Sequence, residues 1–179
     1  SVRRHRTELM EIVPLLGWYM QSRAEEQGHS GRMTYADVEA AMKHFQRTYR
    51  KKERIVDELF QAASDRLWAL TSKEEGSFEF EVLSLREYFA ARYLYKNAGE
   101  GDYRFDRTTV LRELLKRPYW LNTARFYAGN AVGADIYVLK AGVSQELAAN
   151  RSKQVRVAAW SLITDGVFNA RPTEAAAIV

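Results

Sequence analysis

The sequence predicts a mainly α-helical fold, in which a winged-helix-like unit with a short β-hairpin is followed by a HEAT-like helical array. Apolar residues recur at helical spacing along most of the chain, whereas residues 78–82 alternate apolar and acidic side chains like a half-buried strand. The glycine-containing segment 97–102 is the best candidate linker. We therefore expect a helix from a preceding helical domain over residues 1–29, a winged-helix-like domain over 30–97 and a helical region over 103–179.

The first helix is predicted from apolar residues three and four positions apart. Pro14 lies inside this pattern and is expected to kink the helix or to mark its first turn. The basic run at residues 3–6 is interpreted as a solvated helix end in preference to a phosphate-binding arm. Gly28 and Gly31 are expected to interrupt the chain after the helix. The inner face is predicted to contain Leu9, Ile12, Val13, Leu16, Tyr19 and Met20.

A second helix is predicted after Thr34, whose side chain can form a capping box with Asp37. The densest basic cluster follows at residues 47–54. A winged helix could use such a cluster on DNA phosphates, but a solvated face is the favoured interpretation. The inner face of this helix is predicted to contain Tyr35, Val38, Ala41, Met42, Phe45 and Tyr49.

A third helix is predicted over residues 55–70, and a hairpin of residues 68–71 and 77–82 is expected to be the only β-structure. Phe80 and Val82 should then lie buried beneath the third helix.

The next helix is predicted to begin with a capping box formed by Ser84 and Glu87. It is apolar on several sides, which is typical of a helix buried between two layers. The side chains expected to be almost fully buried are those of Leu85, Phe89 and Leu94.

Helical patterns continue to the end of the chain. Asp106 is predicted to cap a helix with Val110, Leu111, Leu114 and Leu115 on its inner face, and Pro118 is predicted to start another. Residues 136–139 could form a strand, but their position among short helices favours a helix. The pattern over 154–166 resembles one helix of a HEAT-like pair, although no fixed repeat period is visible.

Composition limits the possible functions. The 179 residues, 46% of them apolar, fit one or two small packed domains. The formal charge of +4 is a weak argument for a nucleic-acid or acidic partner. The chain has no cysteine and no apolar run near the roughly 18 residues that a membrane span needs. Both ends have the character of cuts within a longer protein, so we expect this chain to be a fragment.

No catalytic or metal-ligating residue is predicted. The sequence lacks the G-x-x-x-x-G-K-[ST] loop of an NTPase. The three histidines, His5, His29 and His44, are far apart and have no partners at metal-ligand spacing. Ser84 has no histidine near it in sequence that could activate it as a nucleophile. The tryptophans occur at helical spacing and are expected in the core.

Residues 80–91 read Phe-Glu-Val-Leu-Ser-Leu-Arg-Glu-Tyr-Phe-Ala-Ala. This stretch resembles the F-x-H-x-S-F-Q-E-[YF]-[FL]-A-A segment of NACHT-type STAND NTPases, which closes the winged-helix domain behind the nucleotide-binding core. The resemblance implies that position 82 would contact a phosphate of bound ADP through a histidine. Val82 occupies that position and has no donor, so it is expected to fill the core and the nucleotide-contacting residues are unknown. The matching residues are Phe80, Ser84, Glu87, Tyr88, Phe89, Ala90 and Ala91.

The resemblance implies a regulatory fragment of a cytoplasmic NACHT/STAND signalling ATPase, which couples trigger sensing to nucleotide-dependent oligomerisation in innate or antiviral defence. ATP or ADP with magnesium would be bound by an upstream P-loop domain of the parent chain, not by this fragment. The implied partners are that domain and further copies of the parent. The alternative is a nucleic-acid-binding winged-helix protein with a helical dimerisation region. An enzyme without a recognisable motif is a third, weaker hypothesis.

Overall fold

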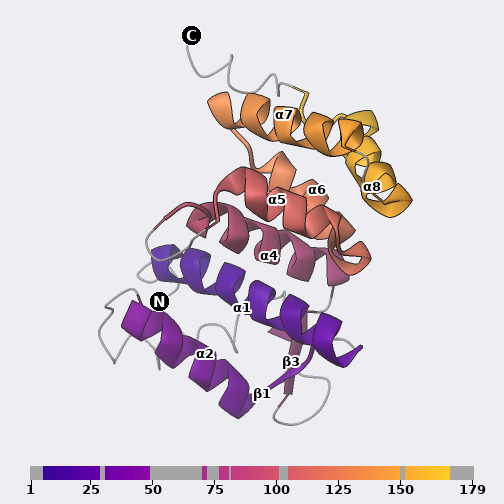
Figure 1. The fold of residues 1–179 in the computed structure, drawn as a ribbon. Helices are drawn as coiled ribbons and strands as arrows, with labels where there is room; N and C mark the ends of the chain where they lie inside the picture. Colours follow the sequence, from indigo (N-terminus) through magenta and orange to yellow (C-terminus); the bar gives the residue numbers. More distant parts are fainter. Residues whose placement is uncertain are drawn as a thin grey trace. The chain divides into compact units, whose positions relative to one another are not determined.

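The computed structural model describes residues 6–28, 31–48, 70–71, 77–80, 82–100, 105–149 and 152–169. The chain divides into two compact units, Ser1–Asn97 and Ala98–Val179, and the division falls inside the segment predicted as a linker. The described elements are mainly helices, with short strands only in the first unit, so the predicted mainly α fold is confirmed (Figure 1).

The described part of the first unit contains helices and short strands, in the following chain order. These are α1 (Arg6–Gln27), β1 (Met33–Thr34), α2 (Tyr35–Thr48), β2 (Leu70–Thr71), β3 (Ser77–Phe80) and α4 (Leu83–Asn97). The predicted third helix and most of the basic cluster lie outside the described residues, as does the start of the first predicted hairpin strand.

The strands form an antiparallel sheet in the order β1-β3-β2. The predicted hairpin is present, because β2 pairs with β3 through Leu70–Phe80 and Thr71–Glu79. The prediction that this hairpin is the only β-structure is wrong, since β1 pairs with the start of β3, where Met33 lies opposite Phe78. A two-residue strand directly before a helix cap has no alternation of its own, so the sequence pattern could not reveal it.

The predicted capping box at the start of α2 is confirmed. The Thr34 backbone N–H donates to Oδ2 of Asp37 at 2.9 Å, and the Asp37 N–H donates to Oγ1 of Thr34 at 3.2 Å. Four of the predicted inward residues, Val38, Ala41, Met42 and Phe45, are buried. Tyr35 is instead exposed, because it is the first residue of the helix.

Helix α1 supplies much of the core of the first unit. The sequence assigned residues 1–29 to a preceding domain, whereas α1 packs against both α2 and α4 within this unit. Pro14 is accommodated inside a single helical span. The buried cluster joins α1, β1, α2, β3 and α4 through Ile12, Val13, Leu15, Leu16, Met20, Met33, Val38, Ala41, Met42, Phe45, Phe80 and Tyr93.

The contact between α1 and α4 is unusually close at Gly17. A Cβ atom placed on Gly17 would lie 2.6 Å from Cβ of Phe89 and 3.0 Å from the backbone nitrogen of Ala90. The same atom would lie 3.1 Å from the carbonyl oxygen of Arg86. Only glycine therefore permits this approach, because two of the three obstructing atoms belong to the backbone of α4.

The buried residues of α4 include Arg86, Ala90, Ala91 and Tyr93. Arg86 and Tyr93 contact α1, because Arg86 donates to a glutamine of α1 and Tyr93 stacks on a tryptophan of α1. The prediction of nearly full burial for Leu85, Phe89 and Leu94 is wrong, because these larger side chains are only partly buried. Leu85 and Phe89 pack at the border of the core instead. Small residues are buried here because the helix backbones approach each other closely.

The second unit is helical throughout its described residues. Its elements are α5 (Arg107–Leu115), the 3₁₀ helix η2 (Pro118–Trp120), α6 (Leu121–Gly129), α7 (Ala134–Ala148) and α8 (Lys153–Thr164). The predicted Asp106 cap is confirmed, since Oδ1 of Asp106 accepts the Thr109 N–H at 2.7 Å. Residues 136–139 are helical, as predicted.

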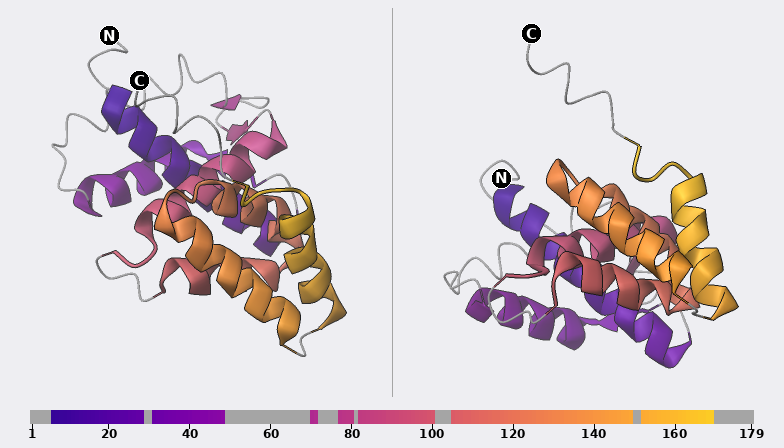
Figure 2. Two further views of the ribbon diagram at one scale, coloured as in Figure 1. Left: turned by 90° about the horizontal axis from the view of Figure 1, so that it is seen from above. Right: turned by 45° about the horizontal axis from the view of Figure 1, so that its top comes forward.

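The helices of this unit stack as two consecutive pairs. Helix α5 contacts α6 and α7 contacts α8, while α5 also contacts α7 and α6 also contacts α8. In both views of Figure 2, α8 lies at an angle across the C-terminal end of α7. The buried residues include Leu111, Leu114, Trp120, Ala124, Tyr127, Leu139, Val143, Ala159 and Leu162. Two stacked helix pairs are the arrangement that a helical array requires.

Candidate functional site

The position that the family resemblance singles out lies at the junction between β3 and α4. β3 ends at Phe80, whose ring packs 5.8 Å from that of Phe89. Val82 lies just before the first helical residue and is 47% exposed. The prediction that Val82 fills the core is therefore wrong, and so is its predicted place in the strand. The alternation fails at this point because the chain leaves the sheet and enters a helix, where side-chain direction follows a different period.

The first turn of α4 exposes three consecutive side chains. Val82, Leu83 and Ser84 are all exposed, and the Leu85 N–H donates to the Val82 carbonyl at 3.0 Å. Because α4 begins at Leu83, Ser84 lies within the first turn and is not the N-cap, so the predicted Ser84–Glu87 capping box is wrong. We call the exposed residues Val82, Leu83 and Ser84 the junction surface. It is mainly apolar and has no ionisable side chain.

Polar contacts with buried members lie near the junction surface. Nε of Arg86 donates to Oε1 of Gln21 at 2.8 Å, and this hydrogen bond between α4 and α1 is buried. In β3, the buried Glu79 lies 3.6 Å from Nε of Arg32. Sequence alternation had indicated an outward position for Glu79. Buried charges need partners, and the contact of Arg86 with Gln21 connects the first turns of α4 to α1.

A carboxyl group with a shifted pKa lies at the α2 cap and not at the junction surface. Burial raises the pKa of the Asp37 carboxyl, but hydrogen bonds from Thr34 and the guanidinium of Arg23 outweigh it, so the pKa lies below its usual value of 3.8. Arg23 reaches Asp37 at 2.9 Å. This arrangement links α1 to the start of α2, and that structural role is sufficient to explain the shifted pKa.

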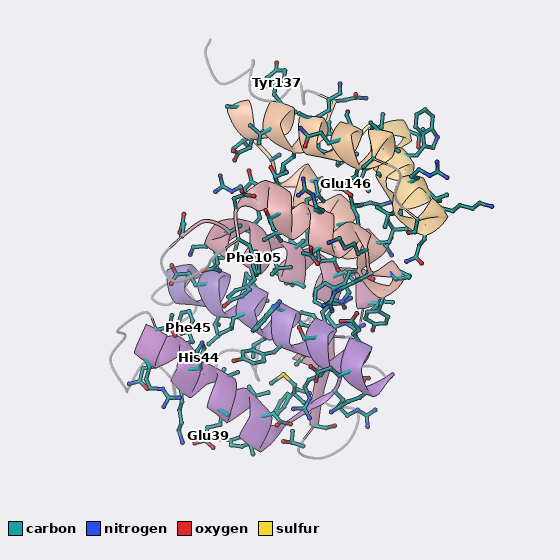
Figure 3. All side chains as sticks on the ribbon, viewed as in Figure 1. Glu39, His44, Phe45, Phe105, Tyr137 and Glu146 are labelled. Atoms are coloured by element: carbon teal, nitrogen blue, oxygen red, sulfur yellow. The ribbon has the colours of Figure 1, made fainter. Side chains whose placement is uncertain are left out.

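The histidines do not form a site in the described residues. His44 is exposed on α2, where its Nε2 lies 3.3 Å from Oγ1 of Thr48, and Figure 3 shows its position. His5 and His29 lie outside the described residues. Within the described part of the chain, no group of three histidine, aspartate or glutamate side chains could hold a metal ion.

The tryptophans differ in their environments. Trp120 is buried, whereas Trp18 is partly buried and stacks on Tyr93 at 5.1 Å. Trp160 is exposed on α8, contrary to the expectation that the tryptophans belong to the core. Trp68 lies outside the described residues.

Comparisons of this chain with models of protein families, with curated proteins and with solved structures found no match. None of the helices that the structure describes has both the length and the apolar character needed to cross a membrane. We take the junction surface as the candidate site because it is exposed and because it lies in the segment that resembles the NACHT motif.

Proposed function

We propose that this chain is a regulatory fragment of a cytoplasmic NACHT/STAND signalling ATPase that acts in innate or antiviral defence. The observation that carries the proposal is the exposure of Val82 at the start of α4. The family motif uses this position to face a bound nucleotide, and an exposed residue can do so whereas a core residue cannot. The succession of short sheet, α4 and stacked helix pairs also supports the proposal.

In this proposal the upstream P-loop domain of the parent binds ATP or ADP with magnesium, and the junction surface packs against that domain. The histidine of the family would donate one hydrogen bond to a charged phosphate, worth about 1.5–3 kcal/mol. Val82 and Leu83 cannot donate it. Covering these two partly exposed side chains contributes a similar free energy, about 1–3 kcal/mol in total. Apolar contact thus replaces the nucleotide contact in holding the resting state closed.

The decisive experiment measures ADP release from the complete parent protein. Val82→Asp and Leu83→Asp should each speed ADP release about tenfold or more, because a carboxylate cannot be buried against the nucleotide domain without a large cost. Met10→Asp is the matched control, since Met10 is also an exposed apolar residue of the first unit but lies on α1. Equal ADP release from all three variants and wild type would contradict the proposal.

The isolated chain provides a second test. It should neither hydrolyse ATP nor bind ATP or ADP with micromolar affinity, which calorimetry with and without magnesium can measure. Turnover by the isolated chain would overturn the assignment. Tight binding of duplex DNA with a steep dependence on salt would favour the nucleic-acid-binding alternative, because phosphate contacts release counterions.

A further inference from the structure

Ion pairs of the second unit connect its second helix pair to its first. Every acidic residue between residues 132 and 169 pairs with an arginine of the preceding helix pair. Asp135 meets Arg107 at 2.6 Å, and Asp165 meets Arg125 at 2.9 Å. Glu146 lies on the side of α7 that faces α5 (Figure 3), and its Oε1 lies 2.6 Å from Nε of Arg112.

The outer side of α8 is positively charged. Lys153 and Arg156 are exposed, and among the described residues neither has an ion-pair partner. The helix span Lys153–Thr164 contains no acidic residue, and the Asp165 carboxylate that follows it is already paired with Arg125. Two cations are therefore uncompensated on this helix.

Two apolar side chains lie on the same side of α8. Val157 and Trp160 are each 59% exposed, and they are neighbours on the helix surface because they lie three positions apart. The buried face of the helix consists of Val155, Ala158, Ala159 and Leu162. Positions three and four apart are neighbours on a helix surface, so one contiguous strip, which we call the α8 outer strip, contains Lys153, Arg156, Val157 and Trp160.

We propose that the α8 outer strip docks an acidic amphipathic helix of a partner polypeptide. Val157 and Trp160 provide the apolar anchors, and Lys153 and Arg156 pair with carboxylates at the edge of the contact. The contact between the two helix pairs of the second unit likewise combines buried apolar residues with arginine–carboxylate pairs. The inference does not depend on the proposed function of the junction surface.

Charge and composition favour a polypeptide with acidic side chains over other occupants. A second copy of this strip would bring four cations and no carboxylate into one contact, which is unfavourable. Two cations are few for a nucleic-acid interface, where about six to ten phosphate contacts are usual. An exposed tryptophan beside a basic residue is typical of a protein-binding hot spot, since tryptophan and arginine are enriched there.

The test is a selection of helical peptides on the complete chain from a library whose surface positions are randomised. Peptides that bind wild type should be enriched in aspartate and glutamate beside aromatic or aliphatic anchors. Trp160→Ala should weaken a selected peptide about 30-fold, the usual scale of a hot spot. The double variant Lys153→Glu/Arg156→Glu should weaken it about tenfold, measured by fluorescence anisotropy at physiological salt.

Lys140→Glu is the matched charge control, because Lys140 is exposed on α7 and lies outside the α8 outer strip. It should change the affinity less than twofold. Circular dichroism should show that all variants keep their helical content, since the substituted side chains are exposed. The proposal is overturned if the selection yields no acidic enrichment, or if the peptides bind the Trp160→Ala variant as tightly as wild type. Tighter binding of duplex DNA or of anionic vesicles than of any selected peptide also overturns it.

Discussion

The two units of this protein join their helices by different means. In the first unit, the backbones of α1 and α4 approach so closely that Gly17 leaves no room for a methyl group. In the second unit, the helix pairs are joined by three ion pairs between arginines and carboxylates, and a glycine contact occurs only at a side chain. The first interface therefore depends on the absence of atoms, whereas the second depends on the presence of charges.

Gly17→Ala should have the largest effect. The added methyl group would collide with backbone atoms of α4, and overpacking of this kind costs up to about 3 kcal/mol. The higher helix propensity of alanine offsets about 1 kcal/mol, so a net loss of about 2 kcal/mol is expected. Urea unfolding measures the loss, and hydrogen exchange should localise it to residues of the first unit. An unchanged stability would show that α1 and α4 can separate without cost.

Glu146→Gln should have the next largest effect. It removes the charge that faces Arg112 from a buried position, and the loss should lie between about 1 kcal/mol for an exposed ion pair and about 3 kcal/mol for a buried one. Because the Arg112 side chain is 33% exposed and can bind water, we expect the lower end of that range. Glu113→Gln is the control, since its pair with Lys116 is exposed. Equal losses in both variants would show that burial of Glu146 contributes nothing.

Asp37→Asn should lower the stability of the first unit by about 1 kcal/mol at neutral pH, the usual value of a helix cap. Because the pKa of Asp37 is lowered by folding, its contribution is present above 3.8 and is lost as the pH falls through the folded-state pKa. The difference between wild type and variant should therefore shrink below about pH 4.

Urea unfolding over a pH series measures this convergence. Glu39→Gln is the control, because its pair with Lys43 is exposed and should contribute little. A difference between wild type and Asp37→Asn that is independent of pH would show that the carboxylate charge has no role.

Gly142→Ala should have the smallest effect, within about 0.5 kcal/mol of wild type. A Cβ at Gly142 would lie 2.6 Å from Cγ2 of Thr108 but 3.8 Å from its Cβ, so a side-chain rotation can relieve the contact. The cost of that rotation is comparable with the gain in helix propensity, about 1 kcal/mol. A loss as large as that of Gly17→Ala, measured by the same urea titration, would remove the contrast between the two units.

Residues 78–97 show where the sequence-based predictions and the structure differ. Apolar spacing predicted the helical character of residues 83–97, but it selected the largest side chains as the buried ones. The close contact with α1 reversed that choice, because the two backbones meet at Gly17 and the small Ala90 is buried there, whereas Phe89 is only partly buried. Likewise, the alternation of residues 78–82 predicted a strand but could not show that it ends at Phe80 and leaves Val82 exposed.

The described helices, the caps at Thr34 and Asp106 and the segment in which the chain divides could be predicted from the sequence. These features depend on interactions within about four positions along the chain, which are visible in the sequence. The third strand, the exposure of Val82, the burial of Glu146 and the exposed basic side of α8 could not be predicted and depend on the tertiary structure. Each of these features depends on contacts between segments that are far apart in the sequence, and no local pattern of residues encodes such contacts.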